Sequence, residues 1–123
     1  MALLIGLVGR AKSGKTTCSD FLSTSHRLHF ENYNLADSLK DAVRNLFLLN
    51  HDHVYTAKKD LPCDGLHGAT PRSYLQKMGD VVRAEFGDDF FCERFRKWYC
   101  SPDRPHKNVV VGDVRRKNEA DAI

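Results

Sequence analysis

The chain has 123 residues, of which 41% are hydrophobic and 28% are charged, so it is predicted to fold as one domain over residues 1–123 and not to remain disordered. No apolar run approaches the ~20 residues of a membrane-spanning helix. The formal net charge of +3 is modest, which suits the binding of small polyanions and gives no reason to expect a nucleic-acid or membrane partner.

The first predicted element is a strand over the apolar run 3–8, which is typical of a parallel strand buried on both faces. The segment Gly9–Thr16 follows it and matches the pattern G-x-x-x-x-G-K-[ST]. A helix is predicted from about residue 14 to residue 25, with Cys18, Phe21 and Leu22 facing the sheet. A chance glycine-rich turn would not require this strand and this helix around it, so the segment is interpreted as a phosphate-binding P-loop.

Each residue type in Gly9–Thr16 has a physical role in binding a nucleotide. Gly9 and Gly14 can adopt backbone angles closed to other residues, and the loop can then turn successive N–H groups toward an anion. Lys15 supplies a charge for the β- and γ-phosphates of ATP, and the Thr16 hydroxyl can ligate Mg²⁺. The expected nucleotide-binding residues are Gly9, Lys12, Ser13, Gly14, Lys15, Thr16 and Thr17.

A second, weaker strand is predicted over residues 28–35, and a helix with an apolar stripe begins at about Ala36. Asp37 or Ser38 is expected to cap this helix. If 28–35 is a parallel strand, Asp37 and Lys40 lie at its carboxyl end, where ligands bind in open α/β sheets. The alternative, a helix cap beside a solvated lysine, agrees equally well with these residues.

Residues 50–69 are expected to form an irregular connection, since they contain a proline, two glycines and many polar side chains. His51, His53, Cys63 and His67 match no known zinc-binding spacing. The histidines are therefore interpreted as surface residues in preference to metal ligands.

Thr70 and Pro71 predict a clean helix start, with threonine as the N-cap and proline in the first helical position. One face of this helix is apolar and contains Leu75, Met78, Val82 and Phe86. The opposite face is polar and contains Arg72, Gln76, Asp80 and Arg83. The polar face could bind a phosphate and the edge of a base, or it could be the solvated side of an amphipathic helix; composition alone favours the second interpretation.

The last predicted elements are a helix with an aromatic packing stripe around Phe91, Phe95 and Trp98 and a buried strand over 109–113. In P-loop proteins a strand that ends in a carboxylate, here Asp113, often lies beside the P-loop strand and carries the Walker B aspartate. We therefore expect a parallel sheet with 109–113 beside 3–8, and with 28–34 on the outer side of 109–113.

Taken together, these stretches resemble the phage-type deoxynucleoside monophosphate kinase family. The matching segments are Gly9–Thr16, Ala36–Lys40, Thr70-Pro71-Arg72 with Leu75-Gln76, Gly79-Asp80 and Arg83, and Val110–Arg115 with Asn118-Glu119-Ala120. The resemblance spans nearly the whole chain and implies a P-loop NTPase fold, with three α/β/α layers around a parallel sheet. Family members continue with further strands and a basic lid-like segment, so we expect a truncated or reduced member that lacks them.

The resemblance implies transfer of the γ-phosphoryl group of ATP, with Mg²⁺ as cofactor, to a deoxynucleoside 5′-monophosphate. The implied catalytic residues are Lys15, Arg72, Asp113 and Arg115, and the implied metal ligands are Thr16 and Asp113. The implied substrate-binding residues are Asp37, Lys40, Arg72, Gln76 and Arg83. Arg72 is expected to bind the acceptor phosphate, because a guanidinium group can bind phosphate with two parallel hydrogen bonds.

Two alternatives stay open. Another P-loop kinase, such as one like dephospho-coenzyme A kinase or phosphomevalonate kinase, would use the same loop with a different acceptor, and a non-catalytic module would bind nucleotide without turnover. The expected partners are small-molecule nucleotides, and a homodimer is left open. The four cysteines lack a C-x-x-C pair and no basic region precedes the first apolar run, which favours reduced thiols, no signal peptide and a cytoplasmic location, the host cytoplasm for a viral protein.

Overall fold

The computed structural model describes residues 2–10, 13–105 and 107–123 and divides into two compact units. Unit 1 comprises Met1–Leu35 and Phe91–Ile123, and unit 2 comprises Ala36–Phe90. In the part of the chain that the structure describes, every helix is too short or too polar to cross a lipid bilayer.

Unit 1 contains a three-stranded parallel sheet in the order β1-β3-β2. The strands are β1 (Leu4–Val8), β2 (Phe30–Tyr33) and β3 (Asn108–Val114). Leu4 pairs with Val109 on one side of β3, and Phe30 pairs with Asn108 on the other. This arrangement confirms the predicted parallel sheet, with the C-terminal strand between the two N-terminal ones.

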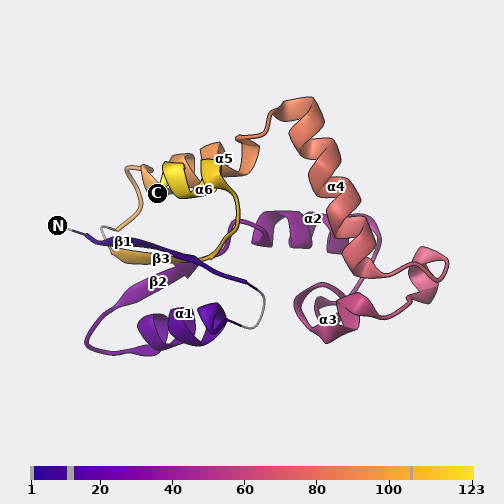
Figure 1. Cartoon of the computed structure of the whole chain (residues 1–123), viewed down its shortest axis with the longest axis horizontal. Helices are drawn as coiled ribbons and strands as arrows, with labels where there is room; N and C mark the ends of the chain where they lie inside the picture. Colours follow the sequence, from indigo (N-terminus) through magenta and orange to yellow (C-terminus); the bar gives the residue numbers. More distant parts are fainter. Residues whose placement is uncertain (1, 11–12, 106) are drawn as a thin grey trace. The chain divides into compact units, whose positions relative to one another are not determined.

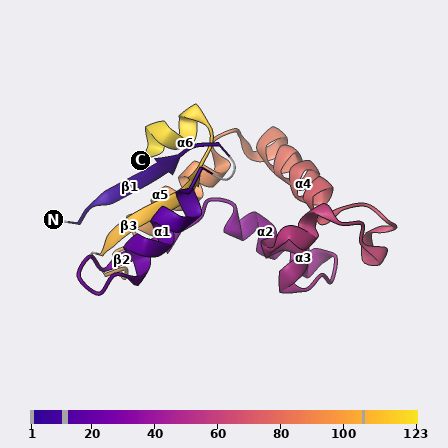
Figure 2. The same ribbon diagram turned by 60° about the horizontal axis from the view of Figure 1, so that its bottom comes forward.

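Helices cover both faces of this sheet (Figures 1 and 2). Helix α1 (Lys15–Thr24) lies on one face, while α5 (Phe90–Tyr99) and α6 (Lys117–Ala122) lie on the other. On the α5 face, Phe95 packs with Val109 and Val111. Because alternate residues of a strand point to opposite faces, the intervening Val110 faces α1 and is also fully buried. Unit 1 is therefore an α/β structure with helices on either side of a parallel sheet.

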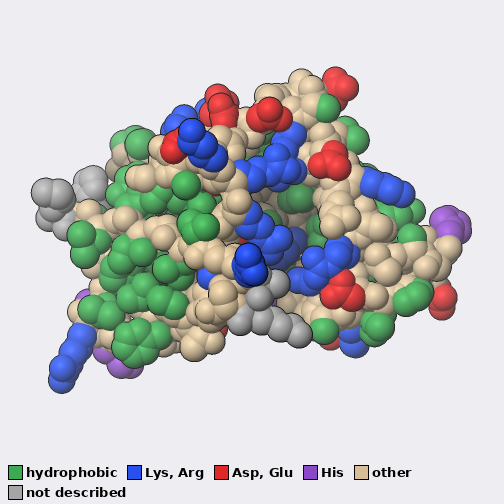
Figure 3. All heavy atoms as spheres, viewed as in Figure 1, with side chains coloured by type: hydrophobic (Ala, Val, Ile, Leu, Met, Phe, Trp, Pro, Cys, Tyr) green, Lys and Arg blue, Asp and Glu red, His purple; other side chains and the backbone are tan. Residues whose placement is uncertain are grey.

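Two expectations about burial in unit 1 were wrong. Strand β1 is only partly covered, because β3 takes the central position and β1 lies at the edge of the described sheet. On α1 the residue buried against the sheet is Ser19, whereas Cys18 is exposed and Phe21 is 66% exposed. Hydrophobic side chains accordingly gather on the surface of unit 1 around β1 and α1 in Figure 3.

Unit 2 is helical and has its own core. Its elements are α2 (Asp37–Leu46), α3 (His51–Tyr55), the 3₁₀ helices η1 (Ala57–Asp60) and η2 (Asp64–Leu66), and α4 (Pro71–Phe86). The core consists of Val43, Leu49, Val54, Cys63, Leu66 and Leu75. The expectation that residues 50–69 are irregular was therefore wrong, since three short helices occupy much of this stretch.

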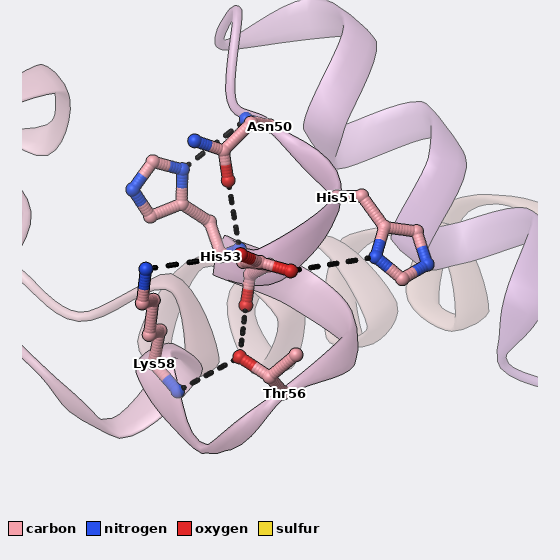
Figure 4. Close-up of polar contacts among 6 residues, drawn as sticks. Asn50, His51, His53, Thr56 and Lys58 are labelled. Carbon is pink, nitrogen blue, oxygen red and sulfur yellow. Dashed lines mark hydrogen bonds and ion pairs between the residues drawn. The ribbon is translucent and has the colours of Figure 1, made fainter.

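Local hydrogen bonds explain why these short helices form. The Asn50 side chain accepts a hydrogen bond from the His53 amide, and His53 Nδ1 accepts one from the Asn50 amide, both at 3.2 Å. This reciprocal cap satisfies two N–H groups that a helix start leaves without partners. Figure 4 shows the two histidines engaged separately, His53 with Asn50 and His51 with Asp52. Among the described residues, no group of His, Cys, Asp or Glu is arranged to hold a metal ion.

The predicted start of α4 is confirmed. Thr70 is the N-cap, its hydroxyl accepts a hydrogen bond from the Ser73 amide at 3.3 Å, and Pro71 occupies the first helical position. The apolar face is less complete than expected, because Phe86 at its end is exposed. The expected side-chain cap of α2 was wrong, because Ala36 is its N-cap and Asp37 is already in the helix.

Candidate functional site

The Gly9–Thr16 loop joins the carboxyl end of β1 to the amino end of α1 in unit 1. Gly14 is the N-cap of α1 and has φ +93°, a left-handed conformation that residues with a Cβ atom rarely adopt. At Gly9 an added Cβ would lie 2.5 Å from Oγ of Ser13, so the Ser13 side chain lies close to the Gly9 backbone and would have to move. The two glycines of the motif therefore have different roles: Gly14 provides a backbone conformation, and Gly9 leaves room for the Ser13 side chain.

Lys15 lies in the first turn of α1, and its ammonium group donates a hydrogen bond to the Gly9 carbonyl. The positive charge is thus held over the loop that precedes the helix, where the N-terminal N–H groups of the helix also favour an anion. Ser13, Thr16 and Thr17 are exposed at the same end of α1. Lys12, also expected to bind the nucleotide, lies outside the described residues.

Asp113 lies near the carboxyl end of β3, the strand that pairs with β1. Its Oδ1 accepts a hydrogen bond of 2.7 Å from the amide of Leu35, the residue at which the chain leaves unit 1 for unit 2. The structure therefore places this carboxylate at the same edge of the sheet as the Gly9–Thr16 loop, because Val8 pairs with Val114.

The turn after β3 is fixed by a buried carboxylate that sequence reasoning did not single out. Glu119 is 8% exposed, and its Oε1 accepts hydrogen bonds from the amides of Arg115 at 3.0 Å and Arg116 at 2.9 Å. Its sequence signal is weak, because the N-cap residue three positions before it is Arg116 and not the serine, threonine, aspartate or asparagine of a usual capping box. The Arg115 side chain, expected to be catalytic, is exposed on this turn.

The oxygen donors at this edge of the sheet fit a magnesium ion. Mg²⁺ is usually held by one or two carboxylates together with water and the phosphates of a substrate, and does not need a cage made only of protein atoms. The Thr16 hydroxyl, in the first turn of α1, and the Asp113 carboxylate, near the end of β3, are hard oxygen donors of this kind.

In unit 2, Arg72 is in the first turn of α4 and forms an ion pair with Asp60 of η1. Its Nε donates to Asp60 Oδ1, and its Nη2 donates to Asp60 Oδ2 at 3.2 Å. These hydrogen bonds lower the pKa of Asp60 and raise that of Arg72. The side chains are 43% and 52% exposed, so solvent and small solutes can reach the pair.

The other residues of the polar face of α4 have different environments. Gln76 is exposed, and the Arg83 side chain is 20% exposed. Arg83 packs beside Gly79, where an added Cβ would lie 3.1 Å from Arg83 Nη1 and 3.3 Å from Leu39 of α2. Gly79 thus leaves room for the side chain of Arg83, one turn further along α4, and for Leu39 of α2.

Asp37 and Lys40 lie on α2 beside Tyr55 of α3. The Tyr55 hydroxyl donates to Asp41 Oδ1 at 2.7 Å and approaches the Asp37 carbonyl at 3.4 Å, while Lys40 Nζ lies 5.1 Å from the centre of the Tyr55 ring. Burial, and then the hydrogen bond to Asp41, raise the pKa of Tyr55 well above its ordinary value. Sequence reasoning missed Tyr55 because its partners are 14 and 18 residues away.

The parallel sheet, with a glycine-containing loop leading from β1 into α1, places unit 1 among α/β proteins. No protein-family model matches the chain, and no solved structure matches it at a significant level. The chain is 39% identical over 133 aligned positions to a protein of Acanthamoeba polyphaga mimivirus named "Putative deoxynucleotide monophosphate kinase". The match covers 98% of this chain and 68% of the viral protein. The chain therefore belongs to the deoxynucleotide-monophosphate-kinase-like family that includes this viral protein.

Proposed function

We propose that the protein transfers the γ-phosphoryl group of ATP to a deoxynucleoside 5′-monophosphate, as a single kinase domain with the P-loop NTPase fold to which both units contribute. The observation that carries the proposal is the Gly9–Thr16 loop between β1 and α1, with Lys15 folded over it and Asp113 on the paired strand. The name of the mimivirus relative supports a deoxynucleotide as the acceptor.

The donor site is the Gly9–Thr16 loop. Its N–H groups and the start of α1 favour the phosphates of ATP, and Lys15 exchanges the Gly9 carbonyl for a phosphate oxygen. Thr16 and Asp113 would hold Mg²⁺, which neutralises phosphate charge when it is bound. Phosphoryl transfer depends mainly on such positioning and charge neutralisation, so a loop with these groups suits the donor.

The acceptor site lies on unit 2, with Arg72 as the phosphate ligand. An oxygen of the acceptor monophosphate attacks the γ-phosphorus, the bond from this phosphorus to the β–γ bridging oxygen breaks, and ADP leaves. No general base is needed, because the acceptor phosphate is ionised at neutral pH. Asp37, Lys40, Gln76 and Arg83 are the further acceptor contacts, and Arg115 is a further cation for the transferring group.

The test is to compare the affinities of donor and acceptor after changing Arg72. Arg72→Ala removes a charge-assisted contact worth about 1.5–3 kcal/mol, so monophosphate affinity should fall roughly 10- to 150-fold while ATP affinity stays near that of the wild type. Arg72→Lys should restore only part of the loss, because lysine cannot form two parallel hydrogen bonds. Isothermal titration of both nucleotides against each variant measures this.

Arg96→Ala is a matched control, since Arg96 is an exposed arginine on α5 of unit 1 with no proposed role. It should change neither affinity. Equal losses for donor and acceptor in Arg72→Ala, or no loss for either, would contradict an acceptor role for Arg72.

A further inference from the structure

We infer that Asp60 is a positioning residue, which orients the Arg72 guanidinium so that its outer edge can bind the acceptor phosphate. The inference rests on the proposed function, because it deepens the role proposed there for Arg72. Asp60 lies twelve residues before Arg72 and belongs to none of the sequence stretches that indicate a kinase.

The geometry of the ion pair determines which part of Arg72 remains available. A guanidinium carries five N–H groups, one on Nε and two on each Nη, and these form two edges that can each bind two oxygens. Asp60 takes the inner edge, through Nε and one N–H of Nη2. The outer edge, with both N–H groups of Nη1 and the second of Nη2, has no hydrogen-bond partner among the described residues.

Both partners of this pair are held by their own local structure. Asp60 ends η1, whose N-cap Thr56 accepts a hydrogen bond from the Lys58 amide at 3.2 Å. Arg72 is fixed by the capped start of α4 at Thr70 and Pro71. Because η1 and α4 also pack against each other, the carboxylate meets the guanidinium from a defined direction.

At the start of α4, the Arg72 side chain is a more important ligand for an anion than the backbone N–H groups. Pro71 has no N–H group, and the Ser73 amide is bonded to the Thr70 hydroxyl. The first turn therefore offers an anion fewer free N–H groups than most helix starts. A phosphate bound here depends largely on the guanidinium and hence on its orientation.

The experiment measures binding of the four common deoxynucleoside 5′-monophosphates, and of ATP, to five proteins: the wild type, Asp60→Asn, Asp60→Glu, Arg72→Ala and the double variant Asp60→Asn/Arg72→Ala. Without its carboxylate partner, Arg72 must be ordered by the ligand itself, so Asp60→Asn should weaken monophosphate binding about 2- to 12-fold. ATP affinity should not change. Asp60→Glu keeps the carboxylate and should restore part of the loss.

The double variant separates positioning from a general structural effect. If Asp60 acts through Arg72, Asp60→Asn should cause no further loss once Arg72 is alanine. The melting temperature should change little, because exposed ion pairs add little stability. In turnover, Asp60→Asn should raise KM for the monophosphate and leave kcat near the wild-type value.

Three results would overturn the inference. Tighter monophosphate binding in Asp60→Asn would show that Asp60 competes with the phosphate, and unchanged binding would show that it has no role. A wild-type protein that binds no monophosphate would overturn the proposed function and this inference with it. Normal wild-type binding that is unchanged in Asp60→Asn would overturn the inference alone.

Discussion

Lys15 shows how the Gly9–Thr16 loop holds the charge that is proposed to bind the donor. Its ammonium group is hydrogen-bonded to the Gly9 carbonyl, a neutral partner that a phosphate oxygen can replace with a stronger, charge-assisted bond. Among the described residues the lysine has no ion pair to break, so under the proposed function it can exchange one neutral partner for a donor phosphate.

Lys15→Ala should lower phosphoryl transfer at least ~100-fold, the usual effect of losing one preorganised electrostatic contact. Its melting temperature should stay near that of the wild type, because the side chain contributes to none of the hydrophobic clusters. Steady-state kinetics and thermal unfolding measure the two effects. Undiminished turnover in this variant would contradict the assignment of Gly9–Thr16 as the donor site.

Tyr55 gives a prediction about pH. Its pKa is raised in the folded protein, so its protonated form stabilises the fold fully below the unfolded value of about 10. Above that pH the unfolded chain loses the proton while the folded chain keeps it, and stability falls. The stability difference between wild type and Tyr55→Phe should thus be constant from pH 7 to about pH 9 and shrink above about pH 10.

Urea unfolding of both proteins across this pH range measures the difference. Asp41→Asn is the control, since it removes the charged partner of the hydroxyl but leaves the tyrosine in place. A difference that stays constant through pH 11 would show that Tyr55 titrates alike in the folded and unfolded chains.

At the scale of elements, the contact between α1 and β3 is what positions the loop. An added Cβ at Gly112 would lie 3.2 Å from Asn34 Oδ1 and 3.3 Å from Ser19 Oγ. Ser19 in turn donates a hydrogen bond of 3.0 Å to the Thr16 carbonyl in the first turn of α1. The close packing of Gly112 is therefore connected to the residue proposed to ligate Mg²⁺.

Gly112→Ala should cost about 1–3 kcal/mol of unfolding free energy, because it overpacks a filled space. It should also weaken ATP binding, because Ser19 and the first turn of α1 must move. Urea unfolding and ATP titration measure these effects, and adding Ser19→Ala should relieve part of both. Gly65→Ala is the control, since a Cβ there would meet only atoms at 3.8 and 3.9 Å. Equal stability of the two single variants would contradict this account.

The sequence predicted the elements that have strong local signals. The start of α4 was predictable because Thr70 and Pro71 determine it locally. The strand order was predictable from the usual arrangement of a loop-bearing strand and a strand that ends in aspartate. The short helices of residues 50–69 were not, since their caps, such as Asn50 with His53, depend on side-chain hydrogen bonds that leave a weak pattern in the sequence.

The candidate site was predictable to a different extent in each part. The Gly9–Thr16 loop could be found from its pattern, because the glycines and Lys15 are adjacent in sequence. The partners of Arg72 and Tyr55 could not, because contacts across 12 to 18 residues depend on how unit 2 folds. Ser19 was missed because a buried serine carries no hydrophobic signal in the sequence, although Gly112 leaves room for it.

At the scale of the whole molecule, the proposed donor and acceptor residues lie in different units. The loop and Asp113 belong to unit 1, and Arg72 with its neighbours belongs to unit 2. The chain passes between the units at Leu35, whose amide is bonded to Asp113, and again at Phe90. The proposed function therefore uses residues from both units.

The most direct test of the proposed kinase activity is to measure ADP formation from ATP in the presence of Mg²⁺, with and without each of the four common deoxynucleoside 5′-monophosphates. The proposed function predicts that ADP forms only when a monophosphate is present, in an amount equal to the deoxynucleoside diphosphate produced, and that Lys15→Ala lowers the formation of both products at least ~100-fold. ADP formation that is independent of the monophosphate would indicate an ATPase. Binding of ATP and monophosphate without any product would indicate a nucleotide-binding module, and either result would contradict the proposed kinase.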